Sequence, residues 1–326
     1  MKKILKVLII DKLHDSFEFH FSNNKIEYTY AFDWKDSKII NQIQKFDGLI
    51  LRSRFAIDEN FLKHTDKLLF VARVGSGTDG IDKKLLQQKN IKLLTAPEGN
   101  RNAVTEHTLG LIFSILNNFK KSQNDLDNFE WNREANRGTE LTGKTVGIIG
   151  YGNVGRLLSK KLYYLGCKVL AYDKRNKKQD DFAKLVSLEE LQEKAQIVSI
   201  HIPLDDDIDG KEGETGNFHF ANEIFFKKFK NSIFFFNTSR GEIVDTKALL
   251  KYLKNGKIKG AGLDVLENEK LSTFTDVQKE QFEQLVAMQN VVLTPHVAGW
   301  TFESYENLNK VLGQKINEFV EDYLLH

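Results

Sequence analysis

The segment from residue 145 to residue 173 limits the possible fold more than any other part of the chain. It opens with a short apolar, β-branched run, which is typical of a buried strand. Three glycines follow in the spacing Gly-x-Gly-x-x-Gly, at Gly150, Gly152 and Gly155. Leucines at three- and four-residue intervals then mark one face of a helix, and a second apolar run ends on Asp173. The pattern predicts a strand, a helix and a second strand parallel to the first.

Each glycine of this segment has a physical role in a nucleotide-binding turn. Gly150 permits the tight turn, Gly152 lets backbone N–H groups approach a pyrophosphate, and Gly155 lets the helix pack closely on the strand. The helix N-terminus offers free N–H groups to phosphates, and Asp173 can accept hydrogen bonds from a ribose diol. Because a carboxylate repels a 2′-phosphate, the sequence favours NAD over NADP, although two basic residues directly follow Asp173.

Length and composition indicate a soluble protein of two domains. A chain of 326 residues is too long for one ordinary hydrophobic core. Its net charge of +2 gives no reason to expect nucleic acid or membrane partners. The single cysteine, Cys167, excludes an intrachain disulfide and fits a reducing cytoplasm. The apolar start is interrupted by Lys6 and favours a first strand over a signal peptide; no membrane span and no metal are expected.

Short β runs alternate with helical patterns, which predicts parallel, doubly wound sheets of the α/β class. We expect a Rossmann nucleotide-binding domain, residues 102–296, inserted into a flavodoxin-like substrate domain of residues 1–101 and 297–326. Strands are expected at residues 6–10, 26–30, 48–51, 68–72, 91–94, 146–149, 168–172, 197–200, 232–237, 260–265 and 291–293.

The regions between these strands also carry patterns. A long apolar helix is expected over residues 102–119 and another helix over 302–325. Residues 120–138 are polar and charged, which favours a loop, and the polar segment 271–290 favours a surface helix and loop.

Chemistry is expected where the strands of the second half end, because ligands of open parallel sheets bind outside the carboxyl ends. Three successive strands are followed there by an arginine, by carboxylates and by a histidine. These residues are Arg240, then Glu267 and Glu269, and finally His296. They would therefore meet at one rim of the sheet.

This set of side chains suits hydride transfer between a nicotinamide and a 2-keto acid. Arg240 can bind the substrate carboxylate and polarise the carbonyl with its planar fork of donors. His296 can exchange the hydroxyl proton near neutral pH, and a carboxylate can orient its ring. Taken singly, each residue could equally be a solvated turn or loop residue. Residue type alone does not choose between Glu267 and Glu269.

Beyond this set, ordered motifs run along nearly the whole chain and resemble the D-isomer-specific 2-hydroxyacid dehydrogenases. The resemblance is greatest to the short 3-phosphoglycerate dehydrogenase branch, which lacks a C-terminal regulatory domain. The motifs lie at residues 73–82, 96–100, 140–150, 201–204, 237–245, 262–265 and 294–300.

The resemblance implies roles for individual residues. It makes Arg240, Glu269 and His296 catalytic, with Glu267 as the alternative to Glu269. The implied cofactor, NAD, would contact Gly150, Tyr151, Gly152, Asn153, Val154, Gly155, Asp173, His201, Pro203, Thr238 and Asp264. Backbone N–H groups of Val74, Gly75 and Ser76 would meet the substrate carboxylate. The helix at residues 102–119 would form a two-fold homodimer interface.

Three departures from the family pattern stand out. Ser239 replaces a usual alanine, and Lys270 replaces the proline that usually follows the catalytic glutamate, which puts the rigidity of that loop in question. The chain also ends soon after the helix that follows Trp300, so no regulatory effector domain is expected.

The substrate is inferred from Arg52, Ser53 and Arg54 at the end of a predicted strand. In the phosphoglycerate branch this segment helps hold a phosphate, and paired guanidiniums suit a dianion. The expected small-molecule substrate is therefore 3-phosphoglycerate, oxidised to 3-phosphohydroxypyruvate in serine biosynthesis. A reductase of glyoxylate, hydroxypyruvate or another 2-keto acid would be favoured if Arg54 points away from the cleft. An NAD-sensing corepressor without activity is the third alternative, and the complete Arg240–Glu269–His296 set argues against it.

Overall fold

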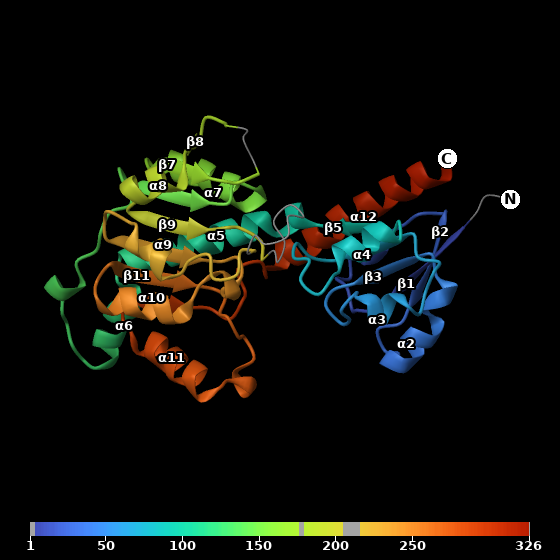
Figure 1. Cartoon of the computed structure of the whole chain (residues 1–326), viewed down its shortest axis with the longest axis horizontal. Helices are drawn as coiled ribbons and strands as arrows, with labels where there is room; N and C mark the ends of the chain where they lie inside the picture. Colours follow the sequence, from blue (N-terminus) through green and yellow to red (C-terminus); the bar gives the residue numbers. More distant parts are fainter. Residues whose placement is uncertain (1–3, 176–178, 205–215, 326) are drawn as a thin grey trace. The chain divides into compact units, whose positions relative to one another are not determined.

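The computed structural model describes residues 4–175, 179–204 and 216–325. The chain forms two compact units (Figure 1). The first contains residues 1–100 and 300–326, and the second contains residues 101–299. The sequence places these boundaries after residues 101 and 296, whereas the structure assigns residue 101 and the segment 297–299 to the second unit.

The first unit is a five-stranded sheet in the order β2-β1-β3-β4-β5, with every neighbouring pair parallel. The strands are β1 (Leu5–Ile9), β2 (Ile26–Tyr30), β3 (Gly48–Leu51), β4 (Phe70–Arg73) and β5 (Lys92–Thr95). The helices are α1 (Phe17–His20), α2 (Asp36–Gln42), η1 (Ile43–Lys45), α3 (Glu59–Leu62), α4 (Lys83–Gln88) and α12 (Phe302–Leu325).

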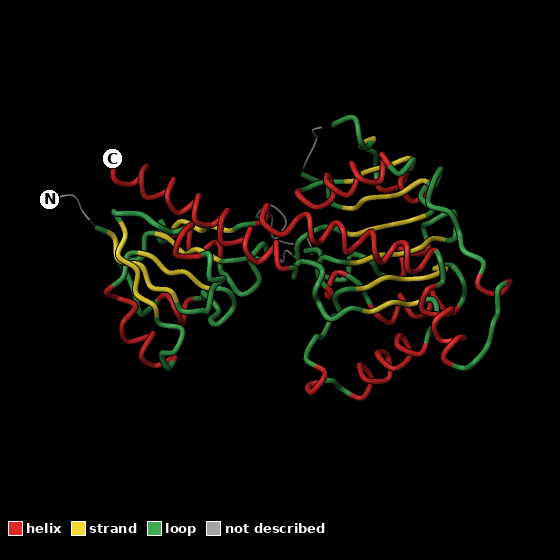
Figure 2. Tube along the Cα trace, turned by 180° about the vertical axis from the view of Figure 1, so that it is seen from behind, coloured by secondary structure: helices red, strands yellow, loops and turns green. Residues whose placement is uncertain are grey.

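Both faces of this sheet are buried, because successive side chains of a strand point to opposite faces. Val7 and Ile9 pack with α1 and α12, whereas Leu8 and Ile10 pack with α2, α3 and α4. Helix α12 lies along its face of the sheet through residues spaced by four, from Leu308 to Val320 (Figure 2). The unit is thus doubly wound, as the apolar runs predict.

The second unit is a seven-stranded parallel sheet in the order β12-β11-β10-β9-β6-β7-β8. Its strands are β6 (Thr145–Ile149), β7 (Lys168–Tyr172), β8 (Lys184–Leu185), β9 (Ile197–Ile200), β10 (Ile233–Asn237), β11 (Ile258–Leu263) and β12 (Val291–Leu293). The chain runs outward from β6 to β8, returns to β9 beside β6, and then runs outward the other way. The switch point between β6 and β9 is where an open α/β sheet binds its ligand.

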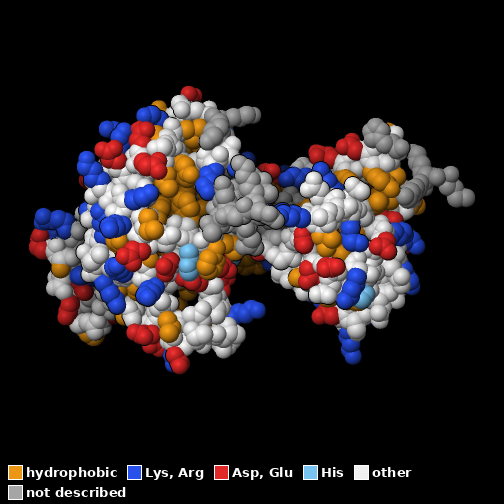
Figure 3. All heavy atoms as spheres, viewed as in Figure 1, with side chains coloured by type: hydrophobic (Ala, Val, Ile, Leu, Met, Phe, Trp, Pro, Cys, Tyr) orange, Lys and Arg blue, Asp and Glu red, His pale blue; other side chains and the backbone are white. Residues whose placement is uncertain are grey.

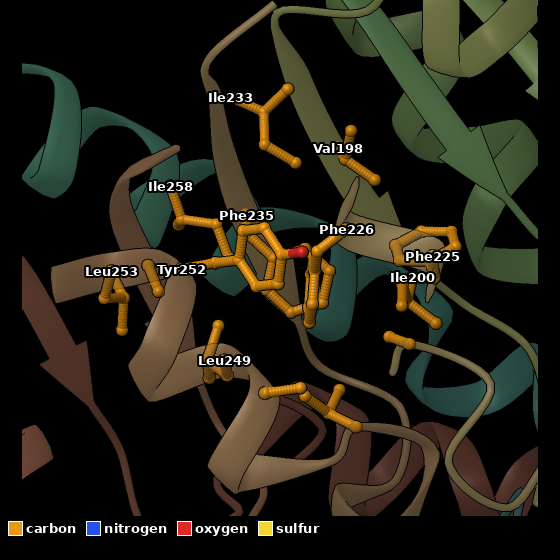
Figure 4. Packing of buried hydrophobic residues seen from close by; sticks show 14 of the residues in the cluster. Val198, Ile200, Phe225, Phe226, Ile233, Phe235, Leu249, Tyr252, Leu253 and Ile258 are labelled. Atoms are coloured by element: carbon orange, nitrogen blue, oxygen red, sulfur yellow. The ribbon is translucent and has the colours of Figure 1, made fainter. Parts of the chain in front are cut away.

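Helices cover both faces of this sheet too. The helices along this part of the chain are α5 (Pro97–Leu116), α6 (Phe119–Asp127), η2 (Glu134–Asn136), α7 (Asn153–Tyr164), α8 (Leu188–Lys194), α9 (Glu223–Lys227), η3 (Gly241–Ile243), α10 (Thr246–Lys254), η4 (Leu271–Thr273) and α11 (Asp276–Ala287). One face packs on α8, α9, α10 and α11, where Phe226 lies edge-on to Phe235 at 5.2 Å between ring centroids (Figure 4). The other face packs on α5 and α7.

The structure differs from the sequence prediction in the polar segments. The predicted loop at 120–138 begins with helix α6, which Asn118 separates from α5 by adopting a left-handed φ of 53°. Lys120 extends from α6 to the carbonyl oxygens of Val286, Met288 and Val291, and so fixes α6 on the second unit. Helix α5 also begins earlier than predicted, at Pro97, since proline suits a first helical position.

Acidic and basic side chains are interspersed over the visible face of each unit (Figure 3). None of the helices in the described parts of the chain is long and apolar enough to cross a membrane.

Candidate active site

The glycine turn between β6 and α7 has the conformation that its sequence predicts. Gly150 adopts a φ of +95°, and a Cβ there would lie 2.6 Å from the carbonyl oxygen of His201. A Cβ on Gly155 would overlap the carbonyl oxygen of Gly150, so only glycine lets α7 approach β6 this closely. Gly152 is the N-cap of α7, and the space around its Cβ position is open. The first N–H groups of α7 are therefore accessible to a phosphate.

A pocket opens beside this turn at the switch point. Its lining comes from the carboxyl ends of β6, β7 and β9 and from the segment before α9. The lining residues are Ile149, Gly150, Gly152, Tyr172, Asp173, Lys174, Arg175, His201, Ile202, Pro203, Asn217 and Phe220. A pocket with a helix N-terminus at one end and a carboxylate at its rim fits a dinucleotide.

The carboxylate of Asp173 is held at this rim by two backbone groups. Its Oδ2 accepts from the N–H of Tyr151 at 2.6 Å, and its Oδ1 accepts from the N–H of Arg175 at 2.8 Å. These two bonds hold the carboxylate at the rim of the pocket, the position at which a Rossmann fold meets the ribose diol.

His201 lines the same pocket as a neutral ring. Burial lowers its pKa to about 3, and its Nε2 lies 2.8 Å from the hydroxyl of Ser199. Next to it, the side-chain amide of Asn217 donates to the carbonyl of Pro203 at 2.9 Å. This wall therefore carries no charge from His201 near neutral pH.

Two residues that were expected to contact the cofactor, Tyr151 and Thr238, have buried side chains. The ring of Tyr151 is fully buried in the core, and its hydroxyl donates to Asp180 at 2.6 Å. Because the ring is in the core, any contact of Tyr151 with the cofactor comes from its main chain. Thr238 is also buried, with its hydroxyl 2.9 Å from that of Thr108. Asn153 and Val154 form the first turn of α7, as expected.

The segments that follow β11 and β12 bring the expected carboxylate and histidine together. Nδ1 of His296 lies 2.9 Å from Oε2 of Glu269, and both side chains are about half exposed. This hydrogen bond raises the pKa of His296, with burial and Arg240 acting in the opposite direction. The charged imidazolium is thereby stabilised next to an accessible surface.

The other candidate carboxylate is used elsewhere. Oε2 of Glu267 lies 3.1 Å from Nε2 of His219, and Oε1 accepts from the N–H of Thr246 at 2.6 Å. The two glutamates are only two residues apart, but their side chains have different partners. The structure therefore pairs His296 with Glu269 and not with Glu267.

Asp264 fixes the backbone of the histidine loop. Its side chain is buried, and its two oxygens accept from the N–H groups of Val297 at 2.9 Å and Ala298 at 2.8 Å. The hydroxyl of Thr294 donates to the same carboxylate at 2.5 Å. His296 adopts a left-handed φ of 52°, which is uncommon for a residue other than glycine, so this anchoring holds an unfavourable conformation.

Arg240 lies on a turn that packs tightly against the neighbouring loop. The amide of Asn237 donates to the carbonyl of Arg240 at 2.8 Å. A Cβ on Gly241 would overlap the backbone of Leu266, so glycine is required where the arginine turn meets the loop that leads to Glu269.

Two of the three departures from the family pattern, Ser239 and Lys270, have local partners. The hydroxyl of Ser239 donates to the side-chain oxygen of Asn237 at 2.7 Å. The N–H of Lys270 donates to the side chain of Asn268 at 3.0 Å, a bond that proline cannot make. This turn restrains the loop where the usual proline is missing.

Comparisons with known proteins identify the family of this fold and site. Residues 109–298 match the model of the D-isomer specific 2-hydroxyacid dehydrogenase, NAD binding domain. The chain belongs to the D-isomer-specific 2-hydroxyacid dehydrogenases. It is an NAD-dependent enzyme of this class, and the turn, pocket and Asp173 fit that cofactor.

Individual relatives differ in their substrates. The hydroxypyruvate reductase of Thermotoga maritima is 30% identical over 90% of this chain and 91% of its own length. The D-3-phosphoglycerate dehydrogenase of Archaeoglobus fulgidus is 28% identical over 96% of this chain, which spans 56% of that relative. The D-lactate dehydrogenase of Aquifex aeolicus, solved with NAD and lactic acid, shares the fold, with a TM-score of 0.80 and 24% identity over 97% and 96% of the two chains.

Apart from Arg240, the expected substrate residues of this dehydrogenase lie in the first unit, and Arg54 has several acceptors there. Its guanidinium donates to the carbonyl of Ile10 at 3.0 Å and to that of Phe32 at 3.1 Å. It also donates to the carbonyl of Trp34 and forms an ion pair with Asp36 at 2.8 Å. The expectation that Arg54 binds substrate is wrong, because these partners already take its donors.

Arg52 has a different environment. Its guanidinium carbon lies 4.7 Å from the ring centre of Trp300 and 5.1 Å from that of Tyr305. Within the described residues, no oxygen accepts a hydrogen bond from this guanidinium. The carboxylate of Asp11 holds the turn by accepting from the N–H groups of Arg52 and Ser53 at 2.6 and 3.2 Å.

The glycine loop after β4 offers fewer donors than expected. The N–H of Val74 donates to the carbonyl of Leu51, and that of Gly75 donates to the carbonyl of Arg73, both at 2.9 Å. These two N–H groups are therefore not available to a substrate carboxylate. In the described part of the chain the N–H of Ser76 has no such acceptor.

Proposed function

We propose that this dehydrogenase interconverts 3-phosphoglycerate and 3-phosphohydroxypyruvate, which would place it in cytoplasmic serine biosynthesis. The observation that supports this proposal is the guanidinium of Arg52, which rests on two aromatic rings and has no acceptor among the described residues. A preoriented guanidinium is well suited to a phosphate dianion. Relatives named D-3-phosphoglycerate dehydrogenase are consistent with it.

A reductase of hydroxypyruvate, glyoxylate or a similar 2-keto acid is the second candidate. The environment of Arg54 favours this candidate, because its guanidinium already donates to groups of its own unit. Only the guanidinium of Arg52 then remains to bind a phosphate, where two guanidiniums were expected. A substrate without a phosphate needs only the carboxylate-binding groups. The Thermotoga maritima relative carries the name of such a reductase.

In either case the chemistry rests on Arg240, Glu269 and His296. Arg240 binds the substrate carboxylate and polarises the carbonyl oxygen through a second N–H group. Because Nδ1 of His296 donates to Glu269, Nε2 is the nitrogen that faces the substrate hydroxyl. During oxidation Nε2 takes the hydroxyl proton, and Glu269 stabilises the resulting imidazolium. NAD, when bound, supplies the nicotinamide that accepts the hydride.

Steady-state assays on a substrate panel test the proposal. The panel comprises 3-phosphoglycerate, D-glycerate, D-lactate and a branched D-hydroxy acid with NAD or NADP, and the corresponding keto acids with the reduced cofactors. We expect selective turnover of 3-phosphoglycerate with NAD, and a raised KM for it in Arg52→Ala. Turnover of only unphosphorylated acids, or an unchanged KM in Arg52→Ala, would favour the second candidate.

We also propose that the enzyme is a homodimer that uses the region of α5 and α6. Large apolar side chains are exposed on α6 and directly after it: Phe129 is 100% and Trp131 85% accessible, and Phe119 and Leu126 are about half exposed. Such a group favours burial against a second copy. Light scattering after size exclusion should give twice the chain mass, and Trp131→Ser should shift the mass toward the monomer.

A further inference from the structure

His107 is joined to the catalytic loop by a chain of hydrogen bonds. It lies on α5, and its Nε2 is 2.9 Å from the hydroxyl oxygen of Thr294, which directly follows β12. That hydroxyl is 2.5 Å from Oδ1 of Asp264, and Nε2 of His107 is 3.5 Å from the same oxygen. His107 and Thr294 are separated by 187 positions in the sequence.

The direction of these bonds follows from the donors available. A carboxylate only accepts, so the Thr294 hydroxyl must donate its proton to Asp264. The Thr294 oxygen is then an acceptor toward His107, which requires a proton on Nε2 of that ring. The network thus runs from His107 through Thr294 to Asp264, with every donor assigned.

This network supports the backbone of the histidine loop, whereas Glu269 contacts the ring. Asp264 accepts from Val297 and Ala298 through its side chain, and its carbonyl accepts from the N–H of His296 at 2.7 Å. Glu269 restrains the ring of His296, whereas Asp264 restrains the backbone that carries it. Both restraints are needed if the ring is to keep one orientation on a left-handed backbone.

We propose that His107 is a positioning residue for His296, acting through Thr294 and Asp264. The inference rests on the proposed acid–base role of His296. The N–H group of His107 fixes the Thr294 hydroxyl on Asp264, and Asp264 keeps the 296–298 backbone in place. Without that donor the Thr294 hydroxyl can rotate away from the carboxylate, and the His296–Glu269 hydrogen bond loses its alignment.

Replacing the donor tests this role. His107→Leu should lower kcat by about 10- to 100-fold, because small misplacements of a catalytic group have effects of that size. KM and the Kd for NADH should stay within about twofold. The apparent pKa of His296 in the pH–rate profile should also move down, since the hydrogen bond to Glu269 is the main cause of its elevation.

Conservative variants separate positioning from packing. His107→Gln keeps an N–H donor at similar reach and should recover most of kcat, whereas the shorter His107→Asn should behave like His107→Leu. Thr294→Val should reproduce the loss, and His107→Leu should add little to it. Glu106 precedes His107 on α5 and forms an ion pair with Lys161 of α7, so Glu106→Gln is the matched control and should leave kcat unchanged.

Several results would overturn this role of His107. An unchanged kcat and pH profile in His107→Leu and His107→Asn would overturn the proposal. So would a loss that follows the oligomeric mass or the Kd for NADH, since that would assign His107 to the dimer helix or to cofactor binding. If His296→Ala itself keeps full activity, the proposed acid–base function fails, and this inference fails with it.

Discussion

The strand ends of the first unit and those of the second carry similar charged residues but use them differently. In the first unit, Arg54 donates to carbonyl groups and a carboxylate of its own unit, and Arg73 donates to the carbonyls of Arg52 and Gly77. In the second unit, Glu269 and His296 pair with each other and remain about half exposed. The first set is bonded within its own unit, whereas the second keeps accessible surface for the substrate that we propose.

The difference follows from the backbone groups that lie near each set. In the loop from Ala31 to Asp36, the carbonyl oxygens of Phe32 and Trp34 accept from Arg54, which satisfies their need for a donor. In the histidine loop, Asp264 accepts from the N–H groups of Val297 and Ala298. The ring of His296 is therefore not needed as a partner for these backbone groups. A position at a strand end is therefore necessary for this site but does not by itself assign a side chain to it.

The largest expected effect is that of His296→Ala. Removing the proton-transfer group should lower kcat by about 10²- to 10⁴-fold, while NADH binds as before. Fluorescence titration with NADH and steady-state kinetics measure the two quantities. If the variant keeps most of its kcat, the strand ends of the second unit do not carry the proton-transfer group, and the proposed difference between the two units fails.

Glu269→Gln should have the next largest effect and act through pH. Reduction of a keto acid requires protonated His296, so its rate falls as pH rises through the His296 pKa. Glu269 raises that pKa, so in the variant the fall should occur at lower pH, and the rise of the oxidation rate should shift in the same direction. Glu267→Gln is the control, and an equal shift in it would contradict the pairing seen here.

Arg54→Ala should affect stability rather than substrate binding. It leaves the carbonyls of Ile10, Phe32 and Trp34 without their donor, which should lower the free energy of unfolding by about 1–3 kcal/mol. Chemical denaturation measures this, and the KM for the substrate at a temperature where both proteins are folded should not change. A raised KM without destabilisation would return Arg54 to the substrate site.

Arg52→Ala should have the smallest effect on stability. Its guanidinium has no acceptor among the described residues, and loss of its stacking on Trp300 and Tyr305 should cost about 1 kcal/mol or less. Parallel denaturation curves for Arg52→Ala and Arg54→Ala give a direct comparison within one turn. An equal loss in the free energy of unfolding would show that both arginines stabilise the folded state to the same extent.

Much of this molecule could be read from local patterns. The βαβ unit around Gly150, Gly152 and Gly155 and the alternating apolar runs predict two parallel α/β units, because period and turn chemistry are properties of neighbouring residues. The topology rule for parallel sheets adds that Arg240, a glutamate and His296 follow adjacent strand ends.

Other features depend on contacts between residues far apart in the chain. Only the tertiary structure decides that Glu269 rather than Glu267 meets His296, that the ring of Tyr151 enters the core, and that Arg54 serves its own unit. The role inferred for His107 also depends on such a contact, since its partner Thr294 lies 187 positions away in the sequence. Local sequence determines which elements form, but a side chain's partners depend on how those elements pack, and the packing fixes which donors and acceptors are left to satisfy.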